Sequence, residues 1–331
     1  MIISRTPFRV SFFGGGTDYP DWFNEHKGAV LATTINKYCY ITCRYLPPFF
    51  EHKSRIIYSK MEHVMKSIDE INHPAVREAL RFLKINDGLE IHHDGDLPAR
   101  TGLGSSSSFT VGLLNSLYAL KGEMVTKERL GREAIYIEQK MCKENVGCQD
   151  QTLVAQGGFN LIEFSKSHNI QVQSVTIPKE KFELLENHLM LYFTGFSRIA
   201  SHVAHHQIQN IPNRKRELKA LYELVFEAMD VLNHKTEILK FGKLLDESWK
   251  LKRALSDKIS SSNIDDIYTM ARSAGATGGK LLGAGGGGFF LLFVPPEKQK
   301  KVQEKLKKFL HVPFKFENLG SQIIFYQPNG G

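Results

Sequence analysis

The stretch Pro98–Ser108, PARTGLGSSSS, decides how the rest of the chain is interpreted. Gly102 and Gly104 permit a positive φ, so the backbone can close tightly there and present its amide groups to a ligand. Apolar residues then recur at three- and four-residue steps from Phe109 to Leu120, which predicts a buried helix that begins at the serines. A helix N-terminus carries unpaired N–H groups and partial positive charge. We therefore expect this loop to bind an anion, and phosphate is the first choice.

Two better known phosphate-binding loops are excluded by the spacing. No Gly-x-x-x-x-Gly-Lys-Ser/Thr sequence occurs anywhere in the chain. A dinucleotide fingerprint needs a glycine three residues after Gly104, and that position is Ser107. A flexible turn is the simpler interpretation of a Gly/Ser stretch, but Pro98 on one side and the periodic helix on the other argue against it.

Composition places the chain among ordinary enzymes. Of its 331 residues 42% are hydrophobic and 24% are charged, which leaves room for two domains. The formal charge of +8 is spread along the chain, which favours small anionic substrates over nucleic acid. The four cysteines lack the spacing of a disulfide framework or a zinc site. We expect a cytoplasmic protein, because no signal-peptide core or membrane-spanning apolar run is present.

Strand patterns dominate the first half of the chain and helix patterns the second. Strands are expected over residues 2–13 with an interruption at Pro7, and over 30–45, 55–58, 89–93, 159–164, 170–177, 189–194 and 322–326. Helices are expected over 126–143 and around 218–232, 238–249 and 264–274. The change of pattern near residues 178–187 predicts a boundary between one domain of residues 1–185 and a second of residues 186–331.

Two further glycine-rich segments lie near the ends of the chain. The first, Gly14–Asp18, follows a predicted strand and ends in a carboxylate. Asp18 could cap a helix that starts near Pro20, or it could accept hydrogen bonds from substrate hydroxyls beside glycines that let a ligand approach. The second, residues 278–288, exposes many backbone amides before an apolar strand, which suits phosphate or substrate better than a linker does.

Three charged residues are candidates for chemistry. Glu138 lies beside the apolar stripe of the helix predicted over 126–143, so it needs a partner: a salt bridge, or a Mg²⁺ ion shared with phosphate and the hydroxyl of Ser106. Asp150, in a loop expected over 145–151, would be ionised at pH 7 and could accept a proton from an attacking hydroxyl. Arg198 follows a predicted strand and is either an anion ligand or a surface charge.

Three separated stretches then agree with one family. RTPFRVSFFGGGTDYP, PARTGLGSSSS and KLLGAGGGGFF resemble, in order and spacing, motifs one, two and three of the GHMP kinases. The resemblance implies an α+β fold with an N-terminal domain like domain 2 of ribosomal protein S5 and a ferredoxin-like C-terminal domain. ATP and substrate would then lie in the cleft between the two domains, and the chain would be an ATP-dependent kinase.

The resemblance also implies roles for individual residues. It makes Asp150 and its neighbour Arg9 catalytic, and Ser106 and Glu138 the ligands of Mg²⁺. The ATP phosphate loop would consist of Gly102, Leu103, Gly104, Ser105, Ser106 and Ser107. The substrate site would consist of Gly15, Gly16, Thr17, Asp18, Gly283 and Gly285, with Arg198 and Lys280 as candidates for binding a substrate phosphate.

Motif one departs from the galactokinases, because Gly15 stands where they carry the glutamate that contacts the sugar. The FGGGTDY form, the Thr194–Arg198 segment and Gln149–Gln151 resemble the heptose 7-phosphate kinases. That resemblance implies phosphorylation of the anomeric hydroxyl to the 1,7-bisphosphate, toward GDP-heptose and surface polysaccharide. L-fucose kinase domains, or other sugar 1-kinases, are the alternative within the family.

Two alternatives belong to other classes of protein. A regulator that binds sugar and ATP without catalysis would share the motifs, although the intact Glu138 and Asp150 argue against it. A nucleic-acid-binding protein would suit the S5-like domain and the positive charge, but no interleaving of aromatic and basic residues supports it. We expect a small sugar phosphate as partner, no nucleic acid or membrane, and a monomer or homodimer.

Overall fold

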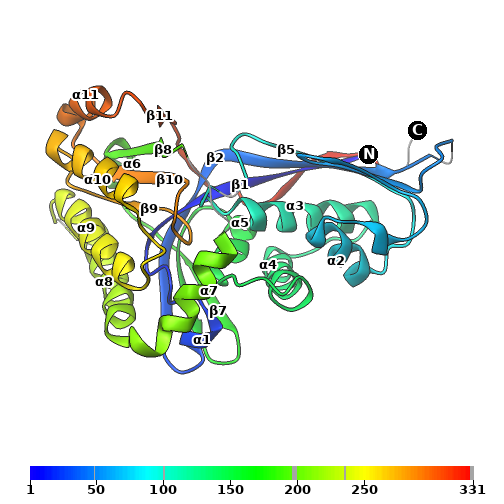
Figure 1. The fold of residues 1–331 in the computed structure, drawn as a ribbon, viewed down its shortest axis with the longest axis horizontal. Coiled ribbons are helices and arrows are strands. Elements are labelled where there is room, and N and C mark those ends of the chain that lie inside the picture. Colours follow the sequence, from blue (N-terminus) through cyan, green and yellow to red (C-terminus); the bar gives the residue numbers. More distant parts are fainter. Residues whose placement is uncertain (48, 100, 196–199, 235, 329–331) are drawn as a thin grey trace.

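The computed structural model describes residues 1–47, 49–99, 101–195, 200–234 and 236–328 of the chain. Its strands form a nine-stranded and a four-stranded sheet, and helices lie against both, which confirms the predicted α+β class. In Figure 1 the large sheet and its helices fill the right-hand part of the molecule, and the small sheet with α8 to α11 fills the left. No helix in the described ranges is long and apolar enough to cross a membrane.

Two long antiparallel strands, β1 (Ile2–Phe13) and β2 (Gly28–Tyr45), form the centre of the nine-stranded sheet. The main order of the sheet is β13-β1-β2-β5-β3-β4. β12 and β6 join it beside β2, and β7 pairs with β6. The remaining strands are β3 (Ser54–Ile57), β4 (Met61–Val64), β5 (Leu89–Gly95), β6 (Phe159–Ser165), β7 (Asn169–Ser174), β12 (Phe316–Glu317) and β13 (Gln322–Tyr326).

The expected interruption of the first strand at Pro7 is wrong. Pro7 lies inside β1, and the pairing with β2 shifts its register between Pro7 and Phe8. A local irregularity of this kind lets a sheet accept a residue without an N–H group. The strand therefore runs on to Phe13 and carries Arg9 toward the middle of the molecule.

The helices of the first half pack against one another and the sheet. They are α1 (Pro20–Phe23), η1 (Ile68–Glu70), α2 (Pro74–Leu83), α3 (Ser105–Leu120), α4 (Lys127–Tyr136), η2 (Ile137–Met141) and α5 (Gln149–Gln156). The predicted start of α3 at the serines is confirmed. The helix predicted over 126–143 continues from α4 into the π-helical turn η2, which contains Glu138. The expected loop over 145–151 is wrong at its end, because Asp150 lies in the first turn of α5.

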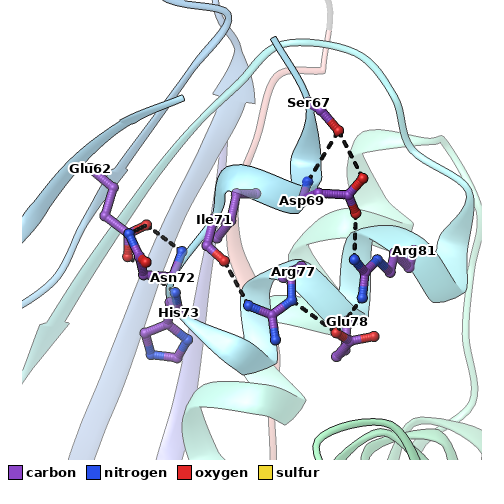
Figure 2. A network of polar contacts seen from close by, with 9 residues as sticks. All are labelled: Glu62, Ser67, Asp69, Ile71, Asn72, His73, Arg77, Glu78 and Arg81. Atoms are coloured by element: carbon purple, nitrogen blue, oxygen red, sulfur yellow. Dashed lines mark hydrogen bonds and ion pairs between the residues drawn. The ribbon is translucent and has the colours of Figure 1, made fainter. Parts of the chain in front are cut away.

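A polar network fixes the connection between β4 and α2 (Figure 2). The Glu62 carboxylate accepts hydrogen bonds from the backbone N–H groups of Asn72, at 2.6 Å, and His73, at 3.1 Å. Arg77 of α2 donates to the Ile71 carbonyl at 2.8 Å, which ties the start of the helix to the same segment. Because α2 contacts α3, this network supports the helix whose N-terminus carries the glycine loop.

The second half is built around an antiparallel sheet of order β11-β8-β10-β9. Its strands are β8 (Leu189–Phe193), β9 (Gly278–Leu281), β10 (Phe289–Phe293) and β11 (Leu310–His311). Its helices are α6 (Lys179–Asn187), α7 (Ala200–Asn210), η3 (Ile211–Asn213), α8 (Lys215–Asn233), α9 (Leu239–Ala254), α10 (Ser262–Ala274) and α11 (Pro296–Lys305). The chain then returns to the first sheet through β12 and β13, and the division at residues 185 and 186 stays a prediction.

Aromatic packing joins the two halves. Phe12 and Phe13 at the end of β1 meet Phe241 of α9 edge to face, with ring centroids 5.6 Å and 5.0 Å apart. One hydrophobic core cluster includes buried residues from both halves. Such contacts contribute about 0.5–1.5 kcal/mol each beyond their buried area. The segment that follows Phe13, Gly14–Asp18, is therefore held directly against the C-terminal half.

Candidate active site

The glycine loop before α3 lies in backbone contact with the C-terminal glycine loop, residues 282–288. Gly102 has a φ of 83° and Gly104 a φ of 76°, the conformation that glycine accepts without strain. A Cβ atom on Gly102 would stand 2.3 Å from the carbonyl oxygen of Leu282, and one on Gly283 would stand 2.5 Å from the Gly102 Cα. Side chains at these positions would separate the two loops, so the sequence needs glycine on both sides of the contact.

Arg9 of β1 and Asp150 of α5 form a bidentate ion pair beside this loop. Nε and Nη2 of Arg9 each donate to one carboxylate oxygen at 2.7 Å, and Nη1 donates to the Gly102 carbonyl at 2.6 Å. The Arg9 side chain is 4% exposed and that of Asp150 is 23% exposed. A Cβ atom on Gly104 would lie 3.5 Å from Oδ2 of Asp150. The guanidinium therefore holds a partly accessible carboxylate next to the N-terminus of α3.

Glu138 is buried beside the start of α3, where Ser107 contacts its carboxylate. The Ser107 hydroxyl donates to Oε2 of Glu138 at 3.1 Å, and Nε2 of Gln151 donates to the same oxygen. Oε1 is buried without a hydrogen-bond partner among the described residues. Burial raises the pKa of this carboxyl to about 7. An oxygen buried without a partner is rare in proteins and is the type of ligand that a hard cation such as Mg²⁺ takes.

Ser106, the serine predicted to share a Mg²⁺ ion with Glu138, is exposed, whereas Ser107 contacts the carboxylate directly. Successive residues of an α-helix differ by about 100° around its axis, so Ser106 and Ser107 face different directions. Within the described part of the chain no group of three or more His, Cys, Asp or Glu could hold a metal ion. Mg²⁺ needs less, since one or two protein oxygens together with substrate phosphates suffice.

Asp18 turns inward instead of capping a helix. It is 3% exposed and accepts a hydrogen bond from the backbone N–H of Gly16 at 3.0 Å, and burial raises the pKa of its carboxyl. The capping interpretation is wrong, because the N-cap of α1 is Tyr19. A Cβ atom on Gly147 would lie 1.9 Å from Oδ2 of Asp18, so the segment before α5 closes over the carboxylate. The Thr17 hydroxyl is buried between backbone groups, where it shapes this loop.

Polar side chains gather around Gly15 and its neighbour Gly16. A Cβ atom there would have Nζ of Lys252 at 3.6 Å, Nε2 of Gln149 at 3.8 Å and Oγ of Ser11 at 3.9 Å. Ser11 Oγ, Gln149 Oε1 and the nearby Gln207 Nε2 are buried with no hydrogen-bond partner in the described ranges. Buried polar atoms are nearly always bonded, so their concentration at one place indicates a polar ligand. We call Ser11, Gly15, Asp18, Gln149, Gln207 and Lys252 the Gly15 cluster.

Two buried lysines come from the C-terminal half. Lys252 of α9 is 6% exposed and donates to the Gly283 carbonyl at 2.6 Å, whereas Lys280 of β9 is 2% exposed and donates to the Phe12 carbonyl at 2.9 Å. Burial lowers the pKa of both, that of Lys252 to about 8. Sequence reasoning missed Lys252. The available signal was its place three residues after Trp249, on the apolar stripe of its helix.

The other predicted substrate contacts are separated by the structure. Gly283 borders the glycine loop before α3. Gly285 packs on Ile259 instead, because a Cβ atom on Gly285 would stand 2.8 Å from the Ile259 Cα. Lys280 is tied to the backbone of β1, which makes it a weaker candidate than Lys252 for a contact with substrate. Arg198 lies outside the described residues.

Comparison with known families agrees with the three motifs. The model of the GHMP kinases N-terminal domain matches residues 68–158, and the model of the GHMP kinases C-terminal domain matches residues 219–312. The D-glycero-alpha-D-manno-heptose 7-phosphate kinase of Campylobacter jejuni is 27% identical over 299 residues, which cover 86% of each chain. The bifunctional fucokinase/GDP-fucose pyrophosphorylase of Arabidopsis thaliana is 26% identical over 309 residues, which cover 84% of this chain and 28% of that protein.

Solved structures share the fold. A D-glycero-D-manno-heptose 1-phosphate kinase from Bacteroides thetaiotaomicron has a TM-score of 0.80 at 23% identity, over 97% of this chain and 98% of that one. The mevalonate kinase of Methanococcus jannaschii has a TM-score of 0.71 at 20% identity, over 96% and 98%. The family predicted from the glycine-rich motifs is thereby confirmed. This chain belongs to the GHMP kinases, and it is an ATP-dependent kinase whose acceptor is an alcohol group.

Proposed function

We propose that the protein transfers the γ-phosphoryl group of ATP to the anomeric hydroxyl of D-glycero-D-manno-heptose 7-phosphate. The product would be the 1,7-bisphosphate, made in the cytoplasm on the way to GDP-activated heptose for surface polysaccharide. The observation that carries the proposal is the Arg9–Asp150 pair at 2.7 Å beside the phosphate loop. The choice of sugar is supported by the Campylobacter jejuni relative, which covers 86% of this chain.

In this proposal Asp150 is the general base. The anomeric hydroxyl gives its proton to the carboxylate while its oxygen attacks the γ-phosphorus and the bond to the β,γ-bridging oxygen breaks. Arg9 fixes the carboxylate with two hydrogen bonds, so that it need not reorient during the reaction. The 23% exposure of Asp150 leaves it within reach of a bound acceptor.

The phosphate loop would stabilise the transferred group. Backbone N–H groups at the N-terminus of α3 (Ser105–Leu120) and the partial positive charge of that helix favour the negative charge of the phosphates. Glu138 and Ser106 would hold Mg²⁺. The unpartnered Oε1 supports the assignment of Glu138, and the choice of Ser106 rests on the resemblance to the family. When bound, the ion would neutralise charge on the ATP phosphates.

The Gly15 cluster would bind the sugar. A polyol both donates and accepts hydrogen bonds, and the cluster offers the Asp18 carboxylate as an acceptor and the Gln207 amide as a donor. Glycine at position 15 leaves the space of a side chain open toward these groups. For the 7-phosphate, Arg198 and Lys280 remain the candidates named from the sequence.

A coupled assay of ADP release tests the proposal. The acceptors are D-glycero-D-manno-heptose 7-phosphate, the corresponding 1-phosphate, L-fucose, D-mannose and D-galactose, each with ATP and Mg²⁺. Turnover with the 7-phosphate alone is expected. Turnover with an unphosphorylated sugar would favour the alternative of an L-fucose kinase or other sugar 1-kinase. The Arabidopsis thaliana relative, at 26% identity, supports that alternative. Absence of turnover with every acceptor would contradict the proposed reaction and favour a non-catalytic regulator.

A further inference from the structure

Lys252 connects the two halves of the molecule at the substrate side. It belongs to α9 in the C-terminal half, whereas Asp18 and Gln149 of the Gly15 cluster come from the N-terminal half. Its ammonium nitrogen donates to the Gly283 carbonyl at 2.6 Å and would stand 3.6 Å from a Cβ atom on Gly15. The side chain is 6% exposed, so the charge is almost completely removed from water.

The ammonium group has more donors than the protein uses. An ammonium carries three N–H donors, and within the described part of the chain one hydrogen bond is formed, to Gly283. The charged groups that face it are Asp18 and Asp150, which favour its charged form, and Arg9 and Lys280, which oppose it. A buried cation with unused donors is costly unless a further acceptor completes its shell.

A hydroxyl group fits that position better than a phosphate. Two carboxylates, Asp18 and Asp150, act on the Lys252 charge, and both would repel a dianion placed beside it. A hydroxyl oxygen can accept from the ammonium while its proton is donated to Asp18. Hydroxyls that bridge an acid and a base in this way are abundant only on a polyol.

We propose that Lys252 binds a hydroxyl oxygen of the acceptor sugar, opposite Asp18, and is a specificity-determining residue of the kinase. The same side chain holds the C-terminal glycine loop through Gly283, so sugar binding and the position of that loop are linked. This inference rests on the proposed function only in taking the acceptor to be a sugar. It assigns a role to a helix, α9, in which none of the three family motifs lies.

The test is sugar binding without nucleotide, measured by isothermal titration calorimetry. Lys252→Met should weaken the affinity for the acceptor by about 10- to 100-fold, the range for losing a hydrogen bond to a charged group. The affinity for ADP should stay within about twofold, because the effect is confined to the sugar side. Lys250→Met is the matched control, since this lysine of the same helix is 69% exposed and should leave both affinities unchanged.

A pH titration covers the case in which the variant is too unstable to measure. The pKa of Lys252 is lowered to about 8 by burial, so the free wild-type protein loses the positive charge above that pH. Its affinity for the sugar should therefore fall as the pH rises past about 8, whereas Lys252→Arg, which keeps its charge, should show no such fall. A fall of the same size in Lys252→Arg would show that another group titrates, and it would overturn the proposal.

The panel of acceptors separates this inference from the proposed function. If the wild type binds L-fucose but not the heptose, the proposed substrate is wrong, and Lys252→Met is tested with L-fucose. If the wild type and Lys252→Met bind the heptose equally well, the role of Lys252 is wrong and the proposed function stands. If the wild type neither binds nor phosphorylates any of the sugars, both are wrong.

Discussion

Replacing Asp150 with asparagine tests the proposed base with little change of shape. In the wild type each carboxylate oxygen accepts one hydrogen bond from Arg9 at 2.7 Å. An amide offers one oxygen and one NH₂ group, and arginine has donors only. In Asp150→Asn one N–H group of Arg9 must therefore face the NH₂ group of the new amide. The carboxylate that would take the proton is also removed.

Two effects set the size of the loss. A general base contributes about 10²- to 10⁴-fold in rate, which corresponds to about 2.7–5.5 kcal/mol of activation free energy. The lost charge-assisted bond costs about 1.5–3 kcal/mol, because Arg9 is 4% exposed and water cannot easily replace the partner. We expect kcat to fall by about 100- to 10,000-fold. The free energy of unfolding should fall by about 1.5–3 kcal/mol, the cost of the lost hydrogen bond.

The coupled ADP-release assay measures kcat, and thermal melts measure the stability. Asp266→Asn on α10 makes the same substitution at an exposed position and should keep wild-type turnover. Arg9→Met and the double variant complete a cycle, in which the two losses should be far from additive because the residues act as a unit. If Asp150→Asn retains kcat within about tenfold of the wild type, Asp150 is not the base.

Four further substitutions test the glycine loop and the proposed metal site, with Gly122→Ala as a control. Gly102→Ala should lower both the melting temperature and the ATP affinity more than Gly122→Ala does. Both glycines have positive φ, but only at Gly102 would the new Cβ atom meet backbone, the Leu282 carbonyl oxygen 2.3 Å away. Thermal melts and nucleotide titrations compare the two variants. Burial raises the pKa of Glu138 to about 7, so without Mg²⁺ the wild type should lose stability relative to Glu138→Gln as the pH rises from about 4.5 past 7. Added Mg²⁺ should stabilise the wild type above pH 7 but not this variant, and equal responses in melts would contradict the site. Ser106→Ala should weaken Mg²⁺ binding with little effect on stability. Ser107→Ala should cost about 1 kcal/mol of stability, because it removes the 3.1 Å hydrogen bond to Glu138. The opposite result would mean that Ser107 binds the ion and Ser106 has no such role.

The glycine loop and the start of its helix were predictable because their causes are local. Positive φ at Gly102 and Gly104 follows from the missing side chains, and the start of the helix at Ser105 follows from the apolar periodicity after it. The order of three such motifs was enough to identify the family. The sequence predicts a loop at Asp150, whereas the structure has a short helix there. Buried side chains stabilise that helix, and spacing alone does not reveal such packing.

The sequence by itself determined the α+β class, the glycine loop before α3 and the family. Only the tertiary structure decided that Ser107 is the serine that contacts Glu138, since neighbouring helical residues differ by about 100° in direction. It also decided that Lys252, far along the chain from Gly15, completes the polar cluster around that glycine. The physical reason is that helix periodicity can place a lysine on the apolar face of its helix, but the groups that its ammonium meets are set by what the rest of the fold packs against that face.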